Sequence, residues 1–153
     1  MKSLLVLLIL ITKINFGQEL YVGNAVLFSI ASGITEGLKL EERQYMTGGN
    51  NPYSIKLNRL WHKTQFVERG LGVSLGITIG EYSNFDWEKM LLSTFLSAAI
   101  FWNFYDVTIN IVRGYPVFYK SGTSLSFMDA YSNLKIPVLT LALLLNYFYC
   151  WIN

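Results

Sequence analysis

Charged residues are scarce in this sequence, and cysteine and histidine each occur only once. Charged side chains make up 14% of the 153 residues, well below the ~25% of an average soluble domain. The single cysteine, Cys150, excludes an internal disulfide and offers no metal-binding spacing. The single histidine, His62, excludes a paired-histidine metal motif. Because the net charge is only +2, the sequence lacks the strong positive charge that is typical of nucleic-acid-binding proteins.

The motifs that usually identify an enzyme are also missing. The sequence has no Walker loop, no dinucleotide-binding glycine fingerprint and no nucleophile elbow. It therefore predicts no cofactor and no resident metal, and it assigns no catalytic activity. No low-complexity tract, repeat or domain linker interrupts the chain, so we expect a single domain.

Apolar residues dominate what is present, at 52% of the sequence, and the chain begins like a secreted or membrane protein. Lys2 precedes an apolar run over 4–11, and Gly17 is followed by a plausible cleavage point. We expect 1–17 to be a signal peptide and 18–153 to form one helical membrane domain. The alternative is an uncleaved anchor, which is short for a span because Lys13 interrupts it.

Four apolar segments follow, over 20–38, 70–80, 87–112 and 136–152. A spanning helix needs ~20 residues, so the second and fourth segments are short and must tilt or thin the bilayer locally. We expect the second segment to continue an upstream helix, and a further short helix over 125–133. The sequence thus predicts an all-α, membrane-embedded bundle of about four helices.

The basic residues give this bundle an orientation. Nine of the ten lysines and arginines beyond position 17 fall on one side of the four-segment topology. They are Lys39, Arg43, Lys56, Arg59, Lys63, Arg69, Arg113, Lys120 and Lys135. The opposite turn, 81–89, is mostly acidic. Because cytoplasmic loops are enriched in lysine and arginine, we predict a multi-pass protein of the bacterial inner membrane with these residues inside.

Small residues recur at helical spacing within two of the segments. Gly72, Gly76 and Gly80 follow one another at intervals of four, as in a glycine zipper. The segment 20–38 offers a matching row of small side chains, which consists of Ala25, Ser29, Gly33 and Gly37. Rows of this kind let two helices approach closely, so we expect these rows to pack together. A glycine-lined pore is the alternative.

Polar residues form stripes on the same helices. One stripe has Asn58, His62, Gln65 and Arg69, a second has Asn103, Asp106, Asn110 and Arg113, and a third has Ser29, Ser32, Glu36 and Lys39. A charge inside a membrane needs a partner, and Arg113 is the candidate partner of Asp106. Because the stripes lie toward the cytoplasmic helix ends, we expect one polar cluster, formed by Glu36, His62, Arg69, Asn103, Asp106, Asn110 and Arg113.

A set of spaced residues between 61 and 129 adds a resemblance. The set is Trp61-His62, Gln65, Arg69, Phe101-Trp102, Tyr105-Asp106, Asn110, Arg113-Gly114, Pro116, Phe118-Tyr119, Gly122-Thr123-Ser124 and Asp129. This pattern resembles a group of small, uncharacterised, multi-helix membrane proteins of bacteria and their phages. The resemblance covers under half of the chain, implies no activity, and adds Tyr119, Ser124 and Asp129 to the candidate residues. Lys120-Ser121 departs from the pattern before Gly122.

Three functions fit these observations. In the first, the polar cluster is structural and the protein is an accessory, assembly or partner-binding membrane protein, in contact with lipid and with other membrane proteins or itself. In the second, His62, Asp106, Asp129 and Glu36 form the catalytic site of a lipid head-group enzyme with a divalent cation. In that case Arg69 and Arg113 would hold a lipid phosphate. In the third, Asp106 and Glu36 relay protons in a small transporter or pore subunit.

Overall fold

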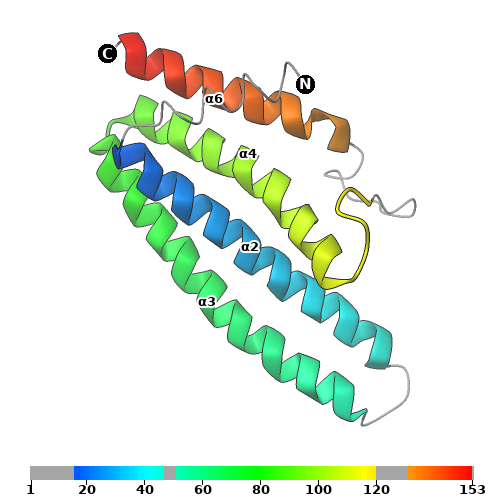
Figure 1. The fold of residues 1–153 in the computed structure, drawn as a ribbon. Coiled ribbons are helices and arrows are strands. Elements are labelled where there is room, and N and C mark those ends of the chain that lie inside the picture. Colours follow the sequence, from blue (N-terminus) through cyan, green and yellow to red (C-terminus); the bar gives the residue numbers. More distant parts are fainter. Residues whose placement is uncertain (1–15, 47–50, 120–130, 153) are drawn as a thin grey trace.

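The structure, a computed structural model, describes residues 16–46, 51–119 and 131–152. Over these ranges the protein is all-helical and has no strand. Its helices are α2 (Phe16–Tyr45), α3 (Pro52–Ser83), α4 (Trp87–Val112) and α6 (Lys135–Ile152), with a 3-10 helix, η2 (Ser132–Leu134), before α6 (Figure 1). The predicted all-α fold class is therefore confirmed.

The predicted segments agree with these helices to different degrees. The bounds of α4 match the segment 87–112, and α6 begins one residue before the segment 136–152. The segment 70–80 belongs to α3, which continues upstream to Pro52 as expected. The segment 20–38 is the middle of the longer α2. Almost all of the predicted signal peptide, and most of the helix expected over 125–133, lie outside the described residues.

Local capping residues explain where α3 and α4 begin. The side chain of Asn51 accepts a hydrogen bond from the backbone N–H of Tyr53 at 2.9 Å, and Pro52 occupies the first turn of α3. Asn84 then adopts the left-handed conformation, with φ of 50°, and ends α3. Two residues later, Asp86 accepts hydrogen bonds from the N–H groups of the first turn of α4. The result is a tight antiparallel α3–α4 hairpin.

The helices run alternately up and down, with α2 between α3 and α4 (Figure 1). α6 packs mainly on α4. The end of α2, the start of α3, the end of α4 and the start of α6 lie at one end, which we call the basic end because of the lysines and arginines around it. The α3–α4 turn, with Glu81, Asp86 and Glu88, lies at the opposite, acidic end. Most of the described lysines and arginines are therefore gathered at one end, where Glu36, Glu41 and Asp106 pair with three of them.

Apolar packing is concentrated toward the acidic end. A cluster of buried apolar residues draws on all four described α-helices and comprises Tyr21, Ala25, Ile79, Leu96, Ala99, Ile100, Leu139, Ala142 and Leu143. Here the Tyr21 hydroxyl of α2 donates to the Asn146 side-chain oxygen of α6 at 3.3 Å. The Asn146 amide donates in turn to the carbonyl of Leu92 in α4 at 3.1 Å. Polar and apolar contacts therefore join α2, α4 and α6 at this end.

Small polar side chains are buried beside the apolar cluster, and many large apolar side chains are exposed. The buried residues include many small polar ones: Ser29, Ser32, Thr35, Ser54, Thr78, Ser83, Ser93, Ser97 and Thr108. Bulky apolar side chains lie outside, among them Phe66 at 81% exposure, Val73 at 66% and Trp87 at 70%. By length and apolar composition, α4 is the one described helix that qualifies as a membrane span.

The glycines pack differently from the prediction. A Cβ added to Gly33 would lie 2.6 Å from the Cβ of Thr108, and one added to Gly37 would lie 2.8 Å from Val112, so both glycines face α4 rather than α3. On α3, Gly72 faces Phe28 of α2, Gly80 faces Phe85, and Gly76 faces open space. The predicted packing of two small-residue rows against each other is therefore wrong. The physical reason is that α2 turns its glycines toward α4, while an aromatic ring separates Gly72 from the α2 backbone.

Candidate functional site

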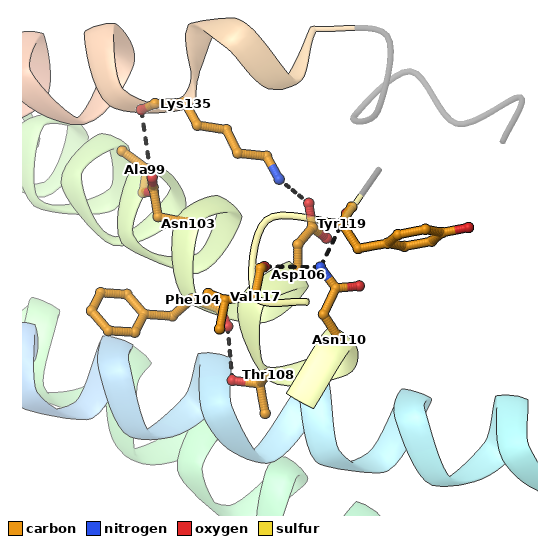
Figure 2. A network of polar contacts seen from close by, with 9 residues as sticks. All are labelled: Ala99, Asn103, Phe104, Asp106, Thr108, Asn110, Val117, Tyr119 and Lys135. Carbon is orange, nitrogen blue, oxygen red and sulfur yellow. Dashed lines mark hydrogen bonds and ion pairs between the residues drawn. The ribbon is translucent and has the colours of Figure 1, made fainter. Parts of the chain in front are cut away.

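The polar face of α4 is used to attach α6. The Asn103 side-chain amide donates to the carbonyl of Ala99, one turn back, and to the carbonyl of Lys135 at 3.2 Å (Figure 2). The ammonium group of Lys135 forms an ion pair with the carboxylate of Asp106. Both side chains are partly buried, with 16% of Lys135 and 26% of Asp106 exposed. Two side chains of α4 thus hold the first residue of α6.

The predicted pairing of Asp106 with Arg113 is therefore wrong. α4 ends at Val112, and Arg113 turns away to Glu41 of α2, with its Nε 3.5 Å from the Glu41 carboxylate. Its guanidinium also donates to the Tyr115 hydroxyl at 3.2 Å. The helical spacing predicted that Asp106 and Arg113 share one helix face. It could not show that the chain comes back after α4 and brings Lys135 of α6 beside Asp106.

Asn110 holds the segment that follows α4. Its side chain is buried and donates to the carbonyl of Val117 at 3.0 Å and to that of Tyr119 at 3.1 Å (Figure 2). The chain reverses at Gly114, where φ is +68°, a conformation that favours glycine. Asn103, Asp106 and Asn110 therefore bind α4 to the chain that follows it, through hydrogen bonds and one ion pair.

A second set of polar contacts joins α2 to α3. Glu42 is buried, and its carboxylate accepts a hydrogen bond from the Asn58 amide at 2.7 Å and another from the Trp61 indole N–H at 2.5 Å. The hydroxyls of Thr35 and Thr64 lie 3.1 Å apart. Sequence reasoning missed Glu42 because it lies outside the polar stripe assigned to its helix. Only the spacing of Asn58 and Trp61, three residues apart on one face of α3, hinted at a shared partner.

His62 and Arg69 are exposed, and the His62 ring stacks on the neighbouring Trp61 ring at 3.7 Å. Across the described ranges, no three His, Cys, Asp or Glu side chains are placed to hold a metal ion. Asp129, the remaining candidate ligand, lies outside those ranges. The seven residues of the predicted polar cluster therefore do not meet in one place. Glu36 lines a separate cleft.

A cleft of about 300 Å³ opens between α2, α3 and α4, toward the basic end. Its lining residues are Phe28, Ser32, Thr35, Glu36 and Lys39 of α2, Trp61, Gln65 and Glu68 of α3, and Phe101 and Tyr105 of α4. The Lys39 ammonium lies 3.4 Å from the Glu36 carboxylate, and both side chains are about one-third exposed. The rings of Phe101 and Tyr105 stack at 4.8 Å and form the α4 wall. This cleft is the candidate functional site.

Part of the cleft was visible in the sequence. Ser32, Glu36 and Lys39 formed one predicted stripe, and Gln65 belonged to another. Glu68 was not singled out, because it lies outside the stripe read along α3. Comparisons with protein families, with curated proteins and with solved structures find no match for this chain.

Proposed function

We propose that this protein is a multi-pass protein of the bacterial inner membrane that binds a partner there and performs an accessory role without catalysis. The observation that carries the proposal is that many small polar side chains and several glycines lie between the helices beside the apolar cluster, while many bulky apolar side chains are exposed. In lipid, helices associate through small residues and interhelical hydrogen bonds rather than through burial of large apolar side chains.

Interhelical hydrogen bonds support the membrane part of this proposal. The Gln18 amide donates to the Tyr82 hydroxyl at 2.8 Å, and the Asn24 amide donates to the hydroxyl of Ser74 at 3.1 Å. Both bonds join α2 to α3. Amide and hydroxyl groups that meet in this way satisfy each other where no water is available.

The distribution of lysine and arginine supports the orientation. At the basic end the described basic residues are Lys39, Arg43, Lys56, Arg59, Lys63, Arg113 and Lys135. At the acidic end, Lys89 is the one basic residue among those described, and it is accompanied by Glu19, Glu81, Asp86 and Glu88. An inner-membrane protein with this distribution places its basic end in the cytoplasm.

The contacts of the candidate catalytic residues support a non-catalytic role. Asp106 is paired with Lys135, and Asn103 and Asn110 hold the chain after α4. His62 is exposed on α3, with no metal-binding group of described residues beside it. Asp106, Asn103 and Asn110 thus hold parts of the bundle together, which favours an accessory function over the lipid head-group enzyme.

Cysteine labelling in intact cells tests the membrane topology. In a Cys150→Ser background, single cysteines replace Lys63 at the basic end and Glu88 at the acidic end, and Arg113→Cys is the matched control for Lys63→Cys. We expect a membrane-impermeant maleimide to label Glu88→Cys from outside, and the other two only after permeabilisation. Release of the protein by alkaline carbonate, or labelling of Lys63→Cys and Arg113→Cys from opposite sides, would refute the proposal.

A further inference from the structure

We propose that the cleft between α2, α3 and α4 binds an organic cation, through an ammonium group held by Glu36 and Glu68 against the aromatic wall. This goes beyond the accessory role proposed above and depends only on the fold of the three helices. The ammonium can belong to a free amine or to an amino lipid head group, and the experiment below distinguishes these sources.

The charges of the cleft favour a cation. Two carboxylates, Glu36 and Glu68, line it together with one ammonium, that of Lys39. Lys39 pairs with Glu36. Among the residues that the structure describes, no ion pair or hydrogen bond involves Glu68. The cleft therefore carries one carboxylate more than its own cation can neutralise.

The aromatic lining fits the same kind of ligand. The rings of Phe28 and Phe101 lie 5.5 Å apart, and that of Tyr105 stacks on Phe101. The face of an aromatic ring attracts an ammonium group, most strongly where water is excluded. Carboxylates combined with aromatic rings select organic ammonium groups over small hydrated metal ions, because the rings contact the carbon atoms next to the charge.

Ser32 is an independent sign that the cleft takes a ligand. This residue lines the cleft and is only 4% exposed, yet its hydroxyl has no hydrogen-bond partner among the described residues. A buried hydroxyl without a partner costs free energy. A ligand with a polar group beside its ammonium, such as the hydroxyl of ethanolamine or the phosphate ester of its lipid, can supply the missing bond. A volume of about 300 Å³ lies at the lower end of the range for small-molecule sites.

The structure also assigns Lys39 a specific effect on this site. Its ammonium neutralises Glu36 and so competes with an external cation for the same carboxylate. Removing the positive charge of Lys39 should strengthen cation binding, whereas removing either carboxylate should weaken it. A general loss of structure cannot produce these opposite signs.

Binding to the full-length protein tests the proposal. The protein is purified in a non-ionic detergent and titrated with choline and with ethanolamine, with glycerol as the uncharged control. Binding is followed by the total fluorescence of the four tryptophans, of which Trp61 lies in the cleft wall. In a second arm, the protein is placed in nanodiscs of phosphatidylglycerol with or without phosphatidylethanolamine. Saturation by the free amines alone assigns a soluble ligand, and a response only to phosphatidylethanolamine assigns a lipid head group.

Three variants and one control decide the result. We expect Glu68→Gln and Glu36→Gln to weaken binding about tenfold, as for loss of one hydrogen bond to a charged group. Lys39→Met should tighten binding severalfold, and Glu81→Gln, with the same charge change as Glu68→Gln but at the acidic end, should have no effect. The proposal is overturned if neither ammonium source gives saturable binding to the folded protein, or if Lys39→Met fails to tighten it.

Discussion

Replacing Gly33 by alanine is the sharpest test of how α2 packs on α4. The added methyl group would lie 2.6 Å from the Thr108 Cβ and 2.8 Å from the carbonyl oxygen of Tyr105. The second of these atoms belongs to the α4 backbone, so side-chain rotation alone cannot relieve the contact. Overpacking of this kind costs about 1–3 kcal/mol. We therefore expect Gly33→Ala to destabilise the protein.

Gly76→Ala is the matched control. Both glycines lie inside long helices, but nothing lies within 4 Å of a Cβ added to Gly76. Alanine is favoured over glycine within a helix by about 1 kcal/mol, so this variant should be slightly more stable than the wild type. The difference between the unfolding free energies of the two variants cancels the effect of helix propensity. It leaves the cost of overpacking at Gly33, about 1–3 kcal/mol.

The assay is equilibrium unfolding of both variants in the same detergent, followed by far-ultraviolet circular dichroism. A Gly33→Ala protein as stable as Gly76→Ala would refute the close α2–α4 contact. A Gly76→Ala protein that is clearly destabilised would instead restore the glycine packing predicted from the sequence for α3.

Two further predictions concern Asp106 and Asn110, which bind α4 to the chain that follows it. Asp106→Asn leaves the partly buried Lys135 without its counter-charge and should cost about 1–3 kcal/mol in the same assay, below the value for a fully buried pair because both groups retain some exposure. In the double variant with Arg113→Gln, the two losses of unfolding free energy should add, because Asp106 and Arg113 have different partners. In the double variant with Lys135→Gln the losses should not add, because both substitutions remove the same ion pair. Asn110→Ala should release the chain over 115–119, and limited proteolysis there should become faster while cleavage at the α3–α4 turn is unchanged. Unchanged proteolysis would contradict the role given to Asn110.

The bounds of α4 and α6 could be predicted from the sequence because they depend on local signals, whereas α2 and α3 extend beyond the predicted apolar segments. The apolar run that begins at Trp87 follows Asp86, whose side chain caps α4, so both the start and the length of that helix were correct. The start of α6 was equally clear from the apolar run after Lys135. These signals require no knowledge of neighbouring helices.

The partners of each face could not be predicted in the same way. A helical period places Gly33 and Gly37 on one face but does not say whether α3 or α4 covers it. Asp106 likewise had a suitable neighbour on its own helix, and only the return of the chain at Lys135 changed its partner. Glu42 is buried through contacts with α3 that depend on the angle between the two helices. Tertiary packing therefore determines which residues form the site. The cleft is lined by three helices, so it could not be predicted from any one of them.

The ion pair between Lys135 and Asp106 has a consequence for how α6 forms. The peptide dipoles of a helix give its N-terminus a partial positive charge, which favours acidic residues there and disfavours a lysine. α6 begins with Lys135 and has no acidic residue in its first turn. Asp106 supplies the missing negative charge from α4. The last helix thus depends on an earlier one for a favourable start, so its formation is coupled to docking.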